Sequence, residues 1–132
     1  MRKALLFTGL ILVSLVSFSQ CLKKYNCQTG YGIYKGADFI YKGNFENGKF
    51  HGKGELKIKN NKYIGDFLDG SYNGFGELYI DNKIYFKGEF KNGKFHGRGT
   101  LFFEQLETVT GEISAKGNIE WTGQFNNGKK EG

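Results

Sequence analysis

The sequence predicts an all-β fold, an antiparallel sheet made of consecutive β-hairpins. One segment recurs along the chain about every 22 residues. Each copy contains two runs in which one face is apolar or glycine and the other polar, and an Asn-Gly or Asp-Gly dipeptide separates the runs. A period of two is typical of strands, and these dipeptides accept the positive φ angles of tight hairpin turns. The chain also has no proline, which would interrupt a ladder of backbone hydrogen bonds.

The repeat is clearest in three full copies. The segment YKGNFENGKFHGKGELKI begins at Tyr41, YIGDFLDGSYNGFGELYI begins at Tyr63, and FKGEFKNGKFHGRGTLFF begins at Phe86. An isolated hairpin is only marginally stable in water, so the copies are expected to stack and bury their apolar faces. We assign full copies to 41–62, 63–85 and 86–103, a half copy to 28–40 and a partial copy to 121–132.

Aromatic residues and glycines share one face of each predicted hairpin. The glycines are predicted to leave space where a ring of a neighbouring hairpin lies on bare backbone, because a side chain there would collide with that ring. The repeated positions of this face are Tyr41, Gly43, Phe45, Gly52 and Gly54, then Tyr63, Gly65, Phe67, Gly74 and Gly76, then Phe86, Gly88, Phe90, Gly97 and Gly99, and finally Trp121, Gly123 and Phe125.

The pattern Y-x-G-x-F, then N/D-G, then G-x-G-x-L resembles the MORN repeat, and the resemblance covers about residues 28–132. It implies an elongated, twisted antiparallel sheet of successive hairpins, with aromatic side chains packed along one groove. Members of this family serve mostly as scaffolds and protein-interaction modules. Binding of acidic phospholipids is also attributed to them.

The repeat is interrupted once and is altered at its last copy. Phe86 and Trp121 are 35 residues apart, which places an insertion at 104–120, where an extended hairpin or a protruding loop is expected. Loops held by a rigid scaffold are common binding elements. In the last copy Lys130 replaces an aromatic residue, as expected for an end cap with a solvated face.

The first nineteen residues, 1–19, are typical of a signal peptide. A basic start precedes the uncharged apolar run ALLFTGLILVSLVSF, which is short for a membrane span. We expect cleavage after Ser19, a linker at 20–27, and export to the periplasm or cell envelope. Lipidation of Cys21, as in a bacterial lipoprotein, is an alternative, although Gln20 stands where that pattern requires a small residue. A third alternative is that the segment is not cleaved and anchors the chain in the membrane.

The cysteines and the charged residues limit the function further. Cys21 and Cys27 can form a disulfide in an oxidising compartment, whereas lipidation of Cys21 would leave Cys27 free.

The formal charge of the whole chain is +6, with lysines alternating with acids, so we expect no nucleic-acid binding. Basic residues on the face opposite the rings are a candidate surface for acidic phospholipid, namely Lys42, Lys53, Lys57, Lys87 and Arg98.

The residues offer no arrangement typical of catalysis. His51 and His96 are the only histidines, and they occupy the same position of two copies that are separated by a third. We therefore predict no catalytic residue, no cofactor and no metal site. A phosphate cradle would need a strand, a glycine-rich turn and a helix N-terminus, and the chain shows no helical period.

These observations favour an exported, non-enzymatic scaffold or interaction module that binds a protein partner at the cell envelope. The alternative is a peripheral membrane module or lipoprotein that contacts acidic lipid through its outer lysines. A small carbohydrate-active envelope enzyme is a remote alternative. So short an array also leaves its ends and sheet edges available for self-association, end to end or edge to edge.

Overall fold

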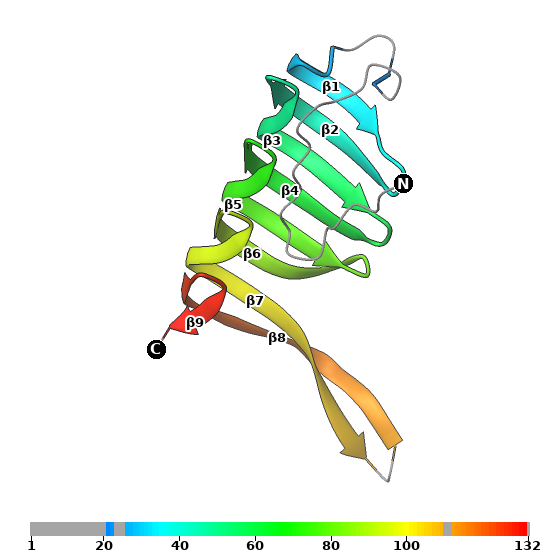
Figure 1. Cartoon of the computed structure of the whole chain (residues 1–132). Coiled ribbons are helices and arrows are strands. Elements are labelled where there is room, and N and C mark those ends of the chain that lie inside the picture. Colours follow the sequence, from blue (N-terminus) through cyan, green and yellow to red (C-terminus); the bar gives the residue numbers. More distant parts are fainter. Residues whose placement is uncertain (1–20, 23–25, 110–111, 132) are drawn as a thin grey trace.

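The computed structural model describes residues 21–22, 26–109 and 112–131, and in them it contains nine strands and no helix. All nine form one antiparallel sheet in which each strand pairs with the next along the chain (Figure 1). The prediction of an all-β sheet of consecutive hairpins is therefore confirmed. The strands are β1 (Thr29–Lys35), β2 (Phe39–Glu46), β3 (Lys49–Ile58), β4 (Asn61–Leu68), β5 (Ser71–Ile80), β6 (Lys83–Lys91), β7 (Lys94–Val109), β8 (Glu112–Asn126) and β9 (Lys129–Glu131).

The Asn-Gly and Asp-Gly dipeptides form the turns that the sequence predicts. Asn47, Asp69, Asn92 and Asn127 all have φ between 48° and 53°, and the glycine that follows each also has a positive φ. Both values belong to the left-handed region, which suits a two-residue hairpin turn. Each turn glycine donates its N–H to a carbonyl of the preceding copy, as Gly70 does to Phe50 at 2.9 Å. The turns therefore also join neighbouring hairpins.

A β-bulge bends each hairpin close to its turn. Gly43 pairs with Gly54 and Phe45 pairs with Phe50, so a single residue of β2 faces three residues of β3. The same irregularity recurs between β4 and β5 and between β6 and β7. Bulges bend a strand and increase its twist. The turn ends of successive hairpins accordingly curl over the sheet (Figure 1).

The bulge explains why the role predicted for one group of glycines is wrong. Gly52, Gly74 and Gly97 were predicted to clear space for aromatic rings, and this is wrong. Each lies in the bulge with a positive φ, which is +69° at Gly52. A Cβ added at Gly52 would meet only the Asn44 side chain, at 3.6 Å. Glycine is needed at these positions for the backbone conformation, because residues with a side chain rarely adopt a positive φ without strain.

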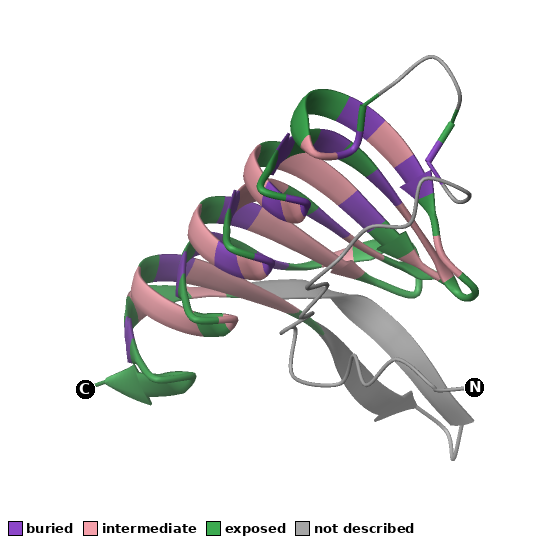
Figure 2. Ribbon diagram, turned by 45° about the horizontal axis from the view of Figure 1, so that its top comes forward, coloured by how far each residue is buried: buried purple, intermediate pink, exposed green. Residues whose placement is uncertain are grey.

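The core is a ladder of aromatic rings that the curl closes over the sheet. Within the first copy Tyr41 stacks on Phe50, with ring centroids 3.8 Å apart and an interplanar angle of 8°. Tyr63 and Tyr72 repeat this stack in the second copy, as do Phe86 and Phe95 in the third. Edge-to-face contacts join the copies, such as Tyr41 to Phe67 of the next hairpin at 5.2 Å. Figure 2 shows that buried positions recur in successive hairpins.

A continuous row of glycines crosses the sheet beneath these rings. Tyr41 lies over Gly54, and Tyr63 and Phe86 lie over the matching glycines of their copies. At these three glycines the covering ring therefore belongs to the glycine's own hairpin, whereas the sequence predicted a ring from a neighbour. Gly32 does have a neighbour's ring, since a Cβ added there would lie 3.2 Å from Phe45 of the next copy. The row contains one glycine from each strand from β1 to β8, paired in register: Gly32, Gly43, Gly54, Gly65, Gly76, Gly88, Gly99 and Gly123.

Burial raises the pKa of Tyr41, Tyr63 and Tyr72 well above the ordinary value of 10.0. The neutral phenol is thus favoured in the folded state, and the unfolded chain ionises first as the pH rises. The resulting stability is complete below pH 10 and is lost above it, by about 1.4 kcal/mol per pH unit for each tyrosine. We predict that Tyr63→Phe reduces the slope of the unfolding free energy against pH by the contribution of one tyrosine. Urea unfolding at several pH values above 10 measures this slope. Equal slopes for both proteins would contradict the prediction.

The two ends of the ladder are closed differently. At the start, Cys21 and Cys27 form a disulfide, and Cys27 is buried, with its Sγ 3.1 Å from where a Cβ at Gly32 would lie. Cys21 also bridges to Tyr34, so the segment expected to be a linker contributes to the sheet edge. At the far end the Lys130 ammonium lies 4.7 Å from the centroid of the Trp121 ring. A cation thus covers the last ring where earlier copies stack an aromatic one.

The insertion predicted at 104–120 lies within a long extension of the β7–β8 hairpin. This two-stranded ribbon projects from the body of the sheet (Figure 1). Pairing between the two strands continues outward from Gly97 and Phe125 to Val109 and Glu112. The predicted signal peptide and its cleavage site lie outside the described residues. Among those that are described, no helix is long and apolar enough to span a membrane.

Candidate functional site

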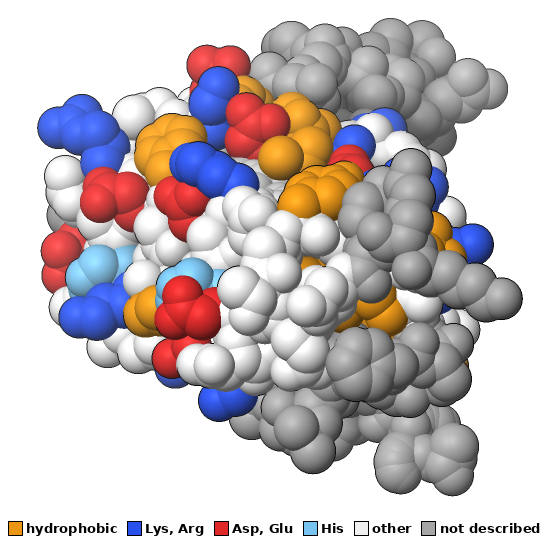
Figure 3. Space-filling model, turned by 90° about the horizontal axis from the view of Figure 1, so that it is seen from above, with side chains coloured by type: hydrophobic (Ala, Val, Ile, Leu, Met, Phe, Trp, Pro, Cys, Tyr) orange, Lys and Arg blue, Asp and Glu red, His pale blue; other side chains and the backbone are white. Residues whose placement is uncertain are grey.

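The face of the sheet opposite the rings, here called the outer face, carries the predicted basic residues. All five are exposed. They are interspersed with acids: Lys53 pairs with Asp66 at 2.7 Å, and Lys87 with Glu77 at 3.4 Å. Figure 3 shows charged side chains of both signs close together, with hydrophobic side chains between them. The outer face is therefore mixed in charge rather than a uniform basic surface.

Some of the outer acids also support the bulges. The carboxylate of Asp66 accepts a hydrogen bond from the backbone N–H of Phe75 at 3.3 Å, and Glu89 accepts one from the N–H of Arg98 at 2.9 Å. Both donors lie in a bulge, where they have no paired residue on the preceding strand, and the carboxylate supplies the acceptor there. The polar residue after the first glycine of a copy thus has a structural role here.

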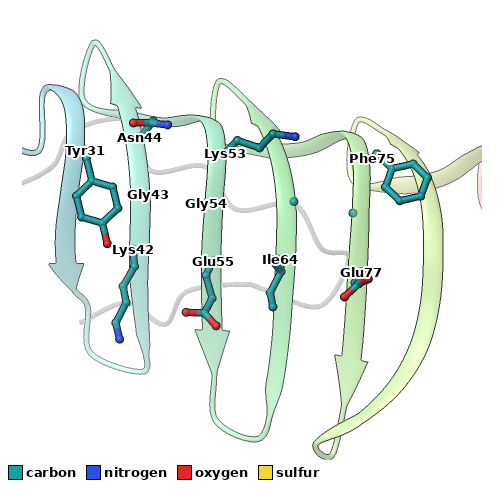
Figure 4. A pocket seen from close by; sticks show the side chains of 12 residues that line it. Tyr31, Lys42, Gly43, Asn44, Lys53, Gly54, Glu55, Ile64, Phe75 and Glu77 are labelled. Carbon is teal, nitrogen blue, oxygen red and sulfur yellow. The ribbon is translucent and has the colours of Figure 1, made fainter.

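A shallow hollow of about 600 Å³ crosses the outer face from β1 to β5 (Figure 4). Its floor is the backbone of the glycine row. Charged and polar side chains line it together with three exposed hydrophobic ones, which are Tyr31, Ile64 and Phe75. None of these three side chains was predicted from the sequence to be part of a site. The sequence does contain a pattern that marks Tyr31 and Phe75, because the middle residue of G-x-G is Tyr31, Lys53, Phe75 and Arg98 in successive copies.

The two histidines each lie in a bulge, at the same position of copies one and three, and copy two separates them. His51 lies 3.7 Å from a carboxylate oxygen of Glu46 and 3.7 Å from one of Asp69, which belongs to the next turn. In the second copy Asn73 takes this position and accepts a hydrogen bond from the N–H of Asn92 at 3.3 Å. The position therefore contacts the following turn. No group of three or more metal-ligating residues could hold a metal ion in the described part of the chain.

The β7–β8 ribbon is the second candidate for a binding element. The pairs that join β7 to β6 end at Leu101, and those that join β8 to β9 begin at Gln124. Between these limits the two strands pair only with each other among the described residues. Each strand of the ribbon consequently presents one edge of backbone N–H and C=O groups that no described strand occupies.

Comparison with known proteins identifies the repeat. The family model described as MORN repeat matches residues 41–61, 63–83, 86–105 and 121–132. The matched segments begin at the first residues of the three full copies and of the partial copy, and the gap between the third and fourth contains most of the insertion. No curated protein matches the chain.

Proposed function

The chain belongs to the MORN-repeat family, and from this we propose that it is a non-enzymatic interaction module that is exported and binds a protein partner at the cell envelope. The family consists of repeat-based interaction modules, and the ring ladder makes this array a rigid support. The typical signal-peptide pattern of residues 1–19 supports export. The disulfide between Cys21 and Cys27 fits an oxidising compartment.

The observation that carries the proposal is the β7–β8 ribbon. It is the one place in the described residues where the repeat is interrupted, and it projects from the sheet with edges that no described strand covers. An extended segment of a partner can add to such an edge, with backbone hydrogen bonds supplying affinity and side-chain contacts supplying specificity. A binding element held on a rigid scaffold is also well positioned for recognition.

Binding to acidic lipid through the outer lysines is less well supported. Lys53 and Lys87, two of the five basic residues concerned, are already paired with Asp66 and Glu77. Attraction to an anionic surface grows with the number of uncompensated cations. Flotation of the chain with liposomes rich in anionic lipid distinguishes the alternatives, because electrostatic attachment weakens as salt is added.

A pull-down from envelope extract tests the proposal with a shortened ribbon. Phe103 pairs directly with Ile119, so replacing residues 104–118 by Asn-Gly closes the hairpin with a two-residue turn and leaves the ladder intact. We expect the full chain to recover a protein that the shortened variant recovers poorly. Thermal unfolding controls for loss of the array. Equal recovery by a folded shortened variant would refute the ribbon as the binding element.

A further inference from the structure

The outer-face hollow has two aromatic platforms at its ends. Tyr31 on β1 is 53% exposed, and Phe75 on β5 is 52% exposed. In Figure 4, which looks onto this face, both rings are seen as open hexagons, so each turns a face outward. Both stand at the middle of G-x-G, and the strand register places them in one row across the sheet, with Asn44, Lys53 and Asp66 between them. Four strand spacings separate them, or roughly 19 Å.

The lining between these rings is polar and balanced in charge. Lys42 and Lys53 provide two positive charges, and Glu55 and Glu77 provide two negative charges. Lys53 is held by Asp66 at 2.7 Å, and Glu77 also accepts a hydrogen bond from the Tyr79 hydroxyl at 2.9 Å. A surface with no excess of either charge gives no general attraction to an anionic or a cationic polymer.

These features match one class of ligand. Pyranose rings carry C–H groups on their faces, and these weakly positive groups are attracted to the negative face of an aromatic ring. Sugar hydroxyls both donate and accept hydrogen bonds, so they suit a lining that contains both carboxylates and ammonium groups. The core of a protein interface, by contrast, is depleted of charged residues. We propose that the hollow binds a neutral linear polysaccharide laid across the strands from Tyr31 to Phe75.

The repeat itself supplies matched variants. Copies one and three carry Lys53 and Arg98 where copy two carries Phe75, so Phe75→Lys places in this copy a residue type that the fold already accepts there. Leu68 is exposed outside the hollow, and the matching position of copy three is Lys91. Leu68→Lys therefore makes the same kind of change, from apolar to basic, away from the proposed site.

Isothermal titration of the full chain with cellohexaose and chitohexaose tests the inference, with a heparin hexasaccharide as an acidic contrast. We expect at least one neutral hexasaccharide to bind, Phe75→Lys to weaken it about tenfold, and Leu68→Lys to leave it unchanged. The shortened ribbon should bind the sugar as well as the full chain does, which separates this inference from the proposed protein partner.

Three results would overturn the inference. One is the absence of binding to both neutral sugars, and another is an affinity that Phe75→Lys leaves unchanged. The third is binding of the heparin hexasaccharide alone, weakening with salt, which would indicate electrostatic attachment to an acidic polymer. If no neutral sugar binds and Phe75→Lys abolishes recovery of a protein in the pull-down, the hollow is a protein-docking surface instead.

Discussion

Gly54→Val is expected to lower the free energy of unfolding by roughly 3 kcal/mol, because the new side chain has no room. A Cβ at Gly54 would lie 2.6 Å from two carbons of the Tyr41 ring. That ring cannot move aside, since it stacks on Phe50 at 3.8 Å and meets Phe67 edge to face at 5.2 Å. Replacing a glycine normally stabilises a strand by limiting the unfolded chain. Here the collision outweighs that gain, and urea unfolding measures the difference.

Gly30→Ala is the control for this prediction. Gly30 has a φ of +82°, and a Cβ added there would meet no atom within 4 Å. The substitution therefore tests backbone strain without a collision, at a cost of about 1 kcal/mol. If Gly54→Val destabilises the protein no more than Gly30→Ala does, the ring does not require the glycine row.

The strands and turns could be predicted from the sequence because they depend on residues within each copy. A period of two places Tyr41, Gly43 and Phe45 on one face, and the Asn47-Gly48 dipeptide fixes the turn after them. Repetition made the assignment secure, since an error in one copy would conflict with the others. The family match and the order of the nine strands agree with this reading.

The bulge could not be predicted from alternation alone. A strict period of two assigns Gly52 to the same face as Phe50 and Gly54, and the bulge breaks that period between Phe50 and Gly54. Gly52 is required for its positive φ angle, whereas Gly54 is required because the Tyr41 ring lies against it. Glycine is therefore needed at two nearby positions for different physical reasons, which the sequence alone does not distinguish.

The hollow was missed for a different reason. Period two correctly places Tyr31 and Phe75 away from the buried rings, but their alignment in one row depends on the register of five strands. The lysines of the same face were predicted to be a binding surface because of their charge. Their pairing with acids such as Asp66 and Glu77 is a property of neighbouring strands, which a single copy does not reveal.

Tyr41→Ala is expected to cost about 3 to 5 kcal/mol of unfolding free energy, because the ring is completely buried and contacts both its own hairpin and the next. Tyr41→Phe is the matched variant. It loses only the hydrogen bond that the hydroxyl donates to the Asn44 carbonyl at 2.8 Å, worth about 1 kcal/mol. The third copy carries Phe86 at this position, so the array already accepts a ring without the hydroxyl.

The position of the damage distinguishes a repeat array from a single globular core. The main contacts of each strand are with the strands beside it, so a defect at Tyr41 should weaken its neighbours and spare distant copies. Hydrogen exchange of Tyr41→Ala should therefore lose protection first in β2, β3 and β4, where the rings of Tyr41, Phe50 and Phe67 meet. β6 and the part of β7 paired with it should keep their protection at the same denaturant concentration. Uniform loss across the sheet would mean that the hairpins fold as one cooperative unit, with the ring ladder transmitting every local defect to both ends.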